Sequence, residues 1–372
     1  MQLHATTAPG LEQVLARELA SLGAKDVAPA VRGVSFRGDL ELAYRANLWL
    51  RTASRVLLAL GEIGAGSREE LYAGIRAMPW EDHMSLDKTL AVEATSHKSE
   101  LTHTQFAARV VKDAVVDRFR DRTGRRPDVN PKRPDLLIAV RLLDNRCWVS
   151  LDLSGERLHR RGYRPPGVPA PLQETLAAGV LMLSGYDGAA PIVDPMCGSG
   201  TLLVEAALMA MNMAPGLLGR DFGFMRLPGF DEKLWRGLKT EARALVRESH
   251  EPFVAGSDIS DDALRATRAS ARTAGVDGVI RIRRADVADL APRTEGMLVT
   301  NPPYGERLGE QRVLAELYRA LGDNLKHRCV GMNAHVLTGS KYLAGCIGLH
   351  PHKRDILWNG PIECRLLHFR MY

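Results

Sequence analysis

The sequence predicts an α/β protein in which a doubly wound, mostly parallel sheet fills the C-terminal half and smaller α+β units precede it. From residue 172 to the end, segments typical of strands and of helices alternate along the chain, whereas over residues 1–160 they follow one another less regularly. Residues 161–171 lie between these halves and hold four prolines and two glycines, which is the composition of a linker. We therefore predict units at 1–50, 51–160 and 172–372.

The composition is that of an ordinary soluble protein. Apolar residues make up 45% of the 372 residues and charged residues 25%, and no apolar run approaches the ~20 residues that span a bilayer. The N-terminus has no secretory pattern, and Glu12 and Glu18 argue against a transit peptide. We expect a cytoplasmic protein without a membrane partner. The five cysteines are widely spaced and form no CxxC pair, so we expect neither a disulfide framework nor a metal site.

Two patterns in the N-terminal half predict particular elements. Residues 104–119 have the periodicity of a long amphipathic helix, whose start Thr102 or Thr104 could cap. The dipeptide Asp144-Asn145 separates two apolar runs, which predicts a β-hairpin. Shorter periodicities predict a helix at 11–22 and strands at 31–38 and 90–95.

Positive charge is concentrated in the N-terminal half. Residues 1–165 carry 26 Lys and Arg against 21 Asp and Glu, and residues 166–372 carry 24 against 23. Clustered basic residues are typical of nucleic-acid binding, although a solvated face gives the same pattern. The candidate RNA-binding residues are Lys98, Arg109, Lys112, Arg125, Arg126, Lys132 and Arg133.

In the C-terminal half the alternation of strands and helices is regular, apart from an insertion at 211–251 that is rich in Gly, Phe and Trp. A turn of the type Asn-Gly-Pro between two apolar runs predicts a closing antiparallel hairpin. The predicted helices are 172–184, 201–213, 261–274 and 310–327, and the predicted strands are 191–194, 252–258, 279–285, 297–300 and 333–338.

A glycine-rich turn follows the first strand of this sheet and leads into a helix. Such a turn lets a ligand lie close to the backbone and to the helix N-terminus, although glycines in a turn of this kind are often purely structural. The spacing lacks the GxxxxGK[ST] pattern, which disfavours a nucleoside triphosphate. The candidate cofactor residues of the turn are Asp194, Met196, Gly198, Ser199, Gly200 and Thr201.

Acidic residues end the next two strands. Asp258 could accept hydrogen bonds from both hydroxyls of a ribose, and Asp286 could accept one from the amino group of an adenine. Taken alone, each acid is equally well explained as a helix cap, but their recurrence at successive strand ends favours a nucleoside site. The apolar residues that follow them, Ile259 and Val287, complete this candidate set.

The fourth strand ends in Asn301-Pro302-Pro303-Tyr304. The prolines have no N–H, so their carbonyls can serve as free acceptors. An exocyclic amino group on an aromatic ring is a poor nucleophile, and the Asn301 side-chain oxygen and the Pro302 carbonyl could accept both of its N–H bonds and aim its lone pair. Tyr304 offers an aromatic face for an unstacked base. We take Asn301, Pro302 and Tyr304 as the candidate catalytic residues.

Together, DPMCGSGT, the two strand-end aspartates and NPPY resemble a class I amino-methyltransferase, with a Rossmann-like fold. The strings LHRRGYR, PLQETLAAGVL and NPPYGERLG are similar to bacterial THUMP-domain RNA guanine-N2 methyltransferases, and most of all to the guanine-N2 half of the large-subunit ribosomal RNA enzymes. KSELTHTQFAARVVKDAVVDRF resembles the THUMP module, an RNA-binding domain that follows a ferredoxin-like domain. NPPY alone also occurs in DNA adenine, protein glutamine and tRNA methyltransferases.

The resemblance implies methyl transfer from S-adenosylmethionine (SAM) to guanine N2 in 23S ribosomal RNA, without a metal ion. It implies that the glycine-rich turn, Asp258 and Asp286 hold the cofactor and that Asn301 to Tyr304 hold the base. In enterobacteria the resembling enzyme is fused to a second methyltransferase, so we expect only the guanine-N2 activity here. A tRNA guanine-N2 methyltransferase and a non-catalytic RNA-binding or assembly factor are the alternatives. We also expect the isolated segment 165–372 to bind SAM, because all proposed cofactor residues lie within it.

Overall fold

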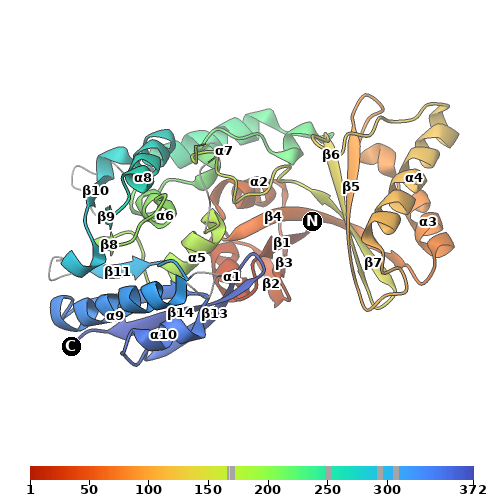
Figure 1. The fold of residues 1–372 in the computed structure, drawn as a ribbon. Coiled ribbons are helices and arrows are strands. Elements are labelled where there is room, and N and C mark those ends of the chain that lie inside the picture. Colours follow the sequence, from red (N-terminus) through yellow and green to blue (C-terminus); the bar gives the residue numbers. More distant parts are fainter. Residues whose placement is uncertain (166, 168–171, 248–253, 291–295, 305–309) are drawn as a thin grey trace.

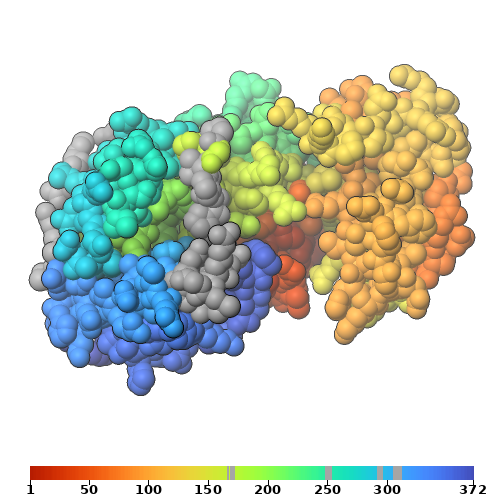
Figure 2. All heavy atoms as spheres, viewed as in Figure 1, coloured from red at the N-terminus to blue at the C-terminus, as the bar shows by residue number. Residues whose placement is uncertain are grey.

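The computed structural model describes residues 1–372 except 166, 168–171, 248–253, 291–295 and 305–309. Its described part forms two seven-stranded sheets with helices packed on them (Figure 1). The space-filling view shows residues 65–150 as a lobe beside the larger body that the rest of the chain forms (Figure 2). No helix within the described ranges is both long and apolar enough to cross a membrane.

The N-terminal sheet is continuous across the proposed boundary between residues 50 and 51. Its strand order is β2-β3-β1-β4-β7-β6-β5, and the long strand β4 pairs with β1 on one side and with β7 on the other. The elements are β1 (Gln2–Thr7), α1 (Glu12–Ser21), β2 (Lys25–Ala30), β3 (Gly33–Arg37), α2 (Leu40–Trp49), β4 (Ala53–Gly64), α3 (Arg68–Ala77), β5 (Leu90–His97), α4 (Thr104–Thr123), β6 (Leu136–Leu143) and β7 (Arg146–Asp152).

Two local predictions in this half have different outcomes. The β6–β7 hairpin is confirmed, since Asp144 and Asn145 have φ values of 48° and 60°, the conformation that a tight two-residue turn requires. The long helix α4 also exists, but the predicted caps are wrong. Its N-cap is His103, whose Nδ1 accepts a hydrogen bond from the Phe106 N–H at 3.3 Å, and it continues to Gly124, which ends it at φ 71°.

The C-terminal sheet has the order β10-β9-β8-β11-β12-β14-β13, and its strands are parallel except for the closing hairpin β13–β14, which confirms the predicted topology. The first strand, β8, lies at the point where the strand order reverses, which is where open α/β sheets bind ligands. The elements are α5 (Glu174–Leu183), β8 (Ile192–Asp194), α6 (Thr201–Ala210), α7 (Glu232–Ala244), β9 (Val254–Asp258), α8 (Asp261–Ala274), β10 (Ile280–Arg284), β11 (Met297–Thr300), α9 (Glu310–Arg328), β12 (Asn333–Thr338), α10 (Lys341–Cys346), β13 (Lys353–Asn359) and β14 (Ile362–Arg370).

The insertion after α6 packs on the N-terminal unit. Its aromatic residues share one core with helix α2, and the rings of Tyr44 and Phe224 stack with their centroids 4.3 Å apart. Trp235, on α7, packs edge-on against Phe224 at 5.2 Å. The Gly, Phe and Trp content of the insertion therefore serves to join the catalytic half to the first unit.

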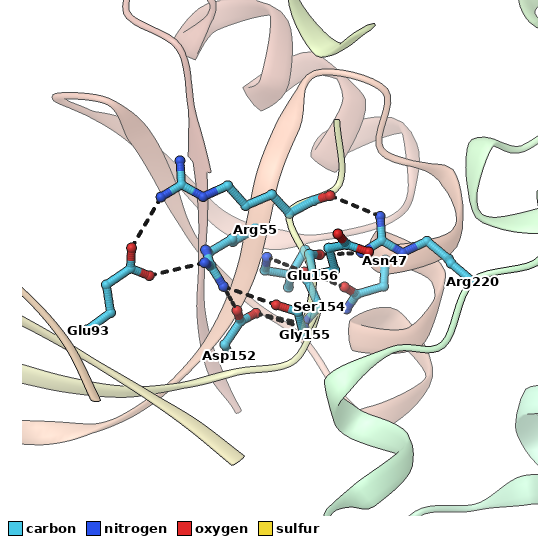
Figure 3. Close-up of polar contacts among 10 residues, drawn as sticks. Asn47, Arg55, Glu93, Asp152, Ser154, Gly155, Glu156 and Arg220 are labelled. Carbon is cyan, nitrogen blue, oxygen red and sulfur yellow. Dashed lines mark hydrogen bonds and ion pairs between the residues drawn. The ribbon is translucent and has the colours of Figure 1, made fainter. Parts of the chain in front are cut away.

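Polar contacts join the sheet to the segment that follows β7. In Figure 3, Arg55 of β4 pairs with Asp152 at the end of β7 and with Glu93 of β5, the latter at 3.0 Å. Arg220, from the insertion, donates to the main-chain carbonyl of Glu156. The segment between β7 and the linker is thus held between the sheet and the insertion.

Candidate cofactor and base-binding site

The four predicted strand ends meet at one edge of the C-terminal sheet. Strands β10, β9, β8 and β11 are adjacent and parallel, and their registers place Asp194 beside Gly256 and Asp258 beside Arg284. Because parallel strands end at the same edge, the glycine-rich turn, Asp258 and Asn301 lie around one site.

The glycine-rich turn requires its glycines. Gly198 and Gly200 have φ values of 53° and 80°, which favour glycine. A Cβ at Gly200 would lie 2.5 Å from Thr267 Cγ2, whereas a Cβ at Gly198 would meet nothing within 4 Å. The turn therefore packs tightly on α8 at Gly200 and has an open side at Gly198, where a ligand can approach the backbone.

Asp194 connects this turn to the catalytic loop. Its Oδ1 accepts hydrogen bonds from Thr300 Oγ1 at 2.7 Å and from the Met196 N–H at 3.1 Å. Burial raises the pKa of Asp194 to about 7, and the nearby charge of Asp258 adds to this, while the two hydrogen bonds oppose it. Since Thr300 directly precedes Asn301, one carboxyl group joins the glycine-rich turn to the segment that begins at Asn301.

Asp258 contributes to the shape of the turn as well as to its charge. Its Oδ2 accepts from the Gly198 N–H and its Oδ1 from the Ser260 N–H, both at 2.9 Å. A carboxylate oxygen has more than one lone pair, so each of the two Asp258 oxygens can still accept a hydrogen bond from a hydroxyl. The neighbouring Ile259 is 61% exposed, which places an apolar side chain at the rim of the site.

Asp286 has the contacts of a helix cap. Its carboxylate accepts from the Ala288 N–H at 2.8 Å at the start of the short helix Val287–Asp289. The side chain of Val287 is 2% exposed and belongs to the core beneath α9. Asp286 itself is exposed, so it remains accessible to a ligand.

In the candidate catalytic loop, residues 301–304, one buried side-chain atom has no hydrogen-bond partner within the described structure. Asn301 Oδ1 is buried and accepts no hydrogen bond within the described part of the chain. Pro302 is buried and Pro303 is exposed. The Tyr304 hydroxyl accepts a hydrogen bond from Asn359 Nδ2 at 3.0 Å, and its ring lies against Gly339. A buried amide oxygen that lacks a donor is costly, and a bound amino group would supply one.

The structure divides the candidate RNA-binding residues into two groups. Lys98 follows β5, and Arg109 and Lys112 lie in the first half of α4. The other four lie between α4 and β6, at the opposite end of the parallel pair β5–β6, roughly 25 Å away at ~3.3 Å per residue. This second group is Arg125, Arg126, Lys132 and Arg133.

The loop of the second group faces the catalytic half, because Arg226 of the insertion lies 3.8 Å from Asp135. Within the described ranges, Lys98, Arg109, Arg125, Lys132 and Arg133 form no ion pair, whereas Lys112 and Arg126 have acidic neighbours. The intervening arginines Arg118, Arg120 and Arg122 pair with acids of the same lobe. The structure thus distinguishes the basic side chains that form ion pairs from those that form none within the described ranges, which the sequence alone cannot do.

The roles of three residues at this site were not predicted from the sequence. Thr300 was read only as the last residue of a strand, and Asn359 only as part of a turn. Arg164 donates to Thr201 Oγ1 at 3.1 Å and pairs with Glu174 at 3.3 Å, so it braces the start of α6. Its place in the RRGYR string was the one available signal. No group of three or more His, Cys, Asp or Glu side chains in the described ranges could hold a metal ion.

Comparison with known proteins agrees with this geometry. Residues 161–368 match the model of the RMKL-like methyltransferase domain, residues 2–57 the RlmL ferredoxin-like domain, and residues 65–152 the THUMP domain. The solved structure of SMU.472 complexed with SAH covers the whole chain, with 98% of that protein aligned, a TM-score of 0.90 and 32% identity. The fold and the site thus define a class I methyltransferase domain preceded by ferredoxin-like and THUMP domains.

The chain belongs to the RMKL-like methyltransferase family. It is 45% identical to the ribosomal RNA large subunit methyltransferase K/L of Syntrophotalea carbinolica, over 99% of this chain and 53% of that protein. It is 40% identical to slr0064 of Synechocystis sp., over 99% of this chain and 96% of that protein. The chain spans about half the length of the K/L relatives that it matches.

Proposed function

We propose that this chain transfers a methyl group from SAM to the exocyclic N2 of a guanine in 23S ribosomal RNA. The observation that carries the proposal is the buried Asn301 Oδ1, which accepts no hydrogen bond in the described structure and lies one residue from the Thr300–Asp194 contact. The names of the K/L relatives support ribosomal RNA as the substrate. A ribosomal RNA substrate places the protein in the cytoplasm.

The residues at the strand ends fit the proposed cofactor. The open side of Gly198 admits the methionyl part against the backbone, and Asp258 has lone pairs left for the ribose hydroxyls. The exposed Ile259 and Asp286 would contact the adenine. The remaining members of the proposed set are Asp194, Met196, Ser199, Gly200, Thr201 and Val287. When bound, SAM supplies a methyl group on a sulfonium, which is a good leaving group.

The chemical work of the protein is to position and polarise the amine. Asn301 Oδ1 and the Pro302 carbonyl would accept its two N–H bonds, which restores nucleophilic character to the nitrogen lone pair. Tyr304 would stack on the extruded base. Methyl transfer would leave SAM as a neutral thioether. The step that then remains is the loss of one proton from the methylated amine.

RNA recognition is assigned to the N-terminal domains. We propose the division 1–50, 51–160, 161–171 and 172–372 into ferredoxin-like domain, THUMP domain, linker and methyltransferase domain. The five basic residues without an ion pair would contact phosphates, and Lys112 and Arg126 would do so by exchanging their acidic neighbours for phosphate. Folded RNA is recognised largely through such backbone contacts.

The test offers purified full-length protein and SAM to protein-free 23S RNA and to total tRNA in parallel, with mass spectrometry of the nucleosides. N2-methylguanosine in the 23S fraction alone is the expected result. The same product in tRNA would favour the tRNA alternative, N6-methyladenosine would overturn the base assignment, and no product from either RNA would favour the non-catalytic alternative.

Asn301→Ala tests the mechanism in the same assay. We expect turnover to fall by about 10²–10³, the usual cost of losing a positioned polar group in a transition state, with SAM affinity unchanged. Since Asn301 Oδ1 has no partner in the described structure, its loss should leave the melting temperature equal or higher. Wild-type turnover in this variant would contradict the mechanism.

A further inference from the structure

Tyr304 is held at its hydroxyl by the C-terminal hairpin. Asn359, the last residue of β13, donates through Nδ2 to the Tyr304 hydroxyl at 3.0 Å. The buried thiol of Cys364, on β14, donates to the Ile362 carbonyl at 3.7 Å, within the same hairpin. Asn359 is also paired with Ile362 in the register of β13 and β14, which anchors the residue in the hairpin.

The ring of Tyr304 is confined as well as its hydroxyl. A Cβ added at Gly339, directly after β12, would lie 3.0 Å from Tyr304 Cδ2 and 3.1 Å from Cε2. The ring therefore lies close against the backbone at Gly339 while its far end is fixed by the hairpin. An aromatic side chain held at both places keeps one orientation of its face, which is what preorganised binding of a base needs.

We propose that Asn359 is a positioning residue for the methylation reaction, which it serves by fixing the plane of Tyr304 on which the target base stacks. This inference rests on the proposed function. It also assigns a role to the hairpin beyond closing the sheet, because the contact comes from the β13–β14 turn and not from the parallel strands that carry the cofactor residues.

Two substitutions separate this role from a general effect on folding. Asn359→Leu has a similar shape but cannot donate, whereas Asn359→Asp can accept a hydrogen bond from the Tyr304 hydroxyl and so restores the contact with reversed polarity. We expect Asn359→Leu to raise KM for RNA or lower kcat by about 3- to 10-fold, the range for one lost neutral hydrogen bond. The dissociation constant for SAM should not change, and Asn359→Asp should recover most of the loss.

A double-mutant cycle then tests the coupling. Tyr304→Phe should have the same effect as Asn359→Leu, and the double variant should be no worse than either single variant. Asn333→Leu, an exposed asparagine at the other end of β12, is the matched control and should behave as wild type. Additive effects, or a loss in Asn333→Leu equal to that in Asn359→Leu, would overturn the proposal.

A readout without catalysis keeps the inference apart from the proposed function. In protein labelled with 3-fluorotyrosine, the ¹⁹F resonance of Tyr304 is assigned by its absence in Tyr304→Phe. We expect one narrow line in the wild type and in Asn359→Asp, and a shifted, broadened or doubled line in Asn359→Leu. If no RNA is methylated, the proposed function fails, while an unchanged Tyr304 line in Asn359→Leu contradicts the positioning role itself.

Discussion

Asp194 is a carboxyl group at the site whose charge state depends on pH near neutrality. Burial raises its pKa to about 7, so the folded protein holds this proton more tightly than the unfolded chain does. The stability that results is present in full at acidic pH and is lost as the pH rises toward and through 7. Ionisation of Asp194 therefore works against folding at alkaline pH.

Asp194→Asn isolates this effect, because both hydrogen bonds of Asp194 go to Oδ1 and an amide oxygen can accept both. We expect the variant to gain stability relative to wild type between pH 5 and pH 8, as read from thermal unfolding at each pH. Asp262→Asn, at an exposed position on α8, is the control and should show no such trend. A difference in melting temperature that stays constant with pH would contradict the assignment.

At the residue scale, the sequence predicts the positions of residues that belong to short motifs, while the roles of those residues stay predictions. Asn301 and Gly198 belong to short strings whose spacing fixes their place in a strand-to-helix or strand-end turn. Asn359 could not be found in this way. The role that we propose for it depends on its contact with Tyr304, which lies 55 residues earlier in the chain. For Asp286 the sequence left a helix cap and a ligand contact as alternatives, and the structure shows that its carboxylate caps the short helix Val287–Asp289.

At the scale of elements, periodic segments were predictable and irregular ones were not. The strands and helices of the C-terminal sheet follow the predicted order, because buried parallel strands and amphipathic helices have distinct periods. Strand β2 is largely exposed and contains a proline, so it has no apolar alternation to detect. Helix α2 was missed as well, and its buried residues include polar Asn47, which bonds back to the Ala43 carbonyl.

The loop between α4 and β6 carries the prediction for RNA binding. Replacing Arg125, Lys132 and Arg133 by Gln removes three charges that form no ion pair in the described structure. If each contacts a phosphate, affinity should fall uniformly across RNA sequences, and the slope of log affinity against log salt should flatten by about 0.7–0.9 per residue. Filter binding at several salt concentrations measures both.

Arg236→Gln is the control for this element, since Arg236 is an exposed arginine on α7 at 70% side-chain exposure. It should leave the salt slope as in wild type. An unchanged slope in the triple variant would contradict this prediction. It would indicate that RNA contacts the other basic group, which includes Lys98 and Arg109, and that the loop between α4 and β6 is only a solvated surface.

For the whole molecule, the described cores cross the boundaries that the sequence suggests. Leu11, the N-cap of α1, and Val14 of α1 belong to the core of the methyltransferase sheet, and a Cβ at Gly179 on α5 would lie 2.6 Å from Leu11. Arg51 donates to the Met213 carbonyl at 2.9 Å. Composition predicts a linker at 161–171 from a change of pattern, but it does not reveal that residues on either side of that segment share a core.

The buried pair Arg161–Glu205 shows what separating the two halves of the chain would cost. The two side chains are 2% and 0% exposed with Nε and Oε1 3.5 Å apart, and Tyr163 donates to Glu205 at 3.1 Å. Cutting the chain at 165 would leave Glu205 buried without either partner, and breaking a buried pair from one side costs about 3–5 kcal/mol. We therefore revise the expectation that the segment 165–372 binds SAM alone, and expect it to lack cooperative unfolding.

The core of the THUMP lobe, by contrast, is drawn almost entirely from residues 65–151. Gly64 and Arg146 are paired across β4 and β7, so an Asn-Gly turn can join them in place of residues 65–145. This deletion keeps α1, Arg51 and Arg161, and with them the shared cores. We expect the shortened protein to unfold cooperatively and to bind SAM in calorimetry as the full chain does, while RNA affinity at physiological salt is lost. These expectations follow from the view that the first domain is an integral part of the catalytic body, whereas the THUMP lobe is appended to it. Loss of SAM binding in the shortened protein, or SAM binding by the segment 165–372, would contradict this view.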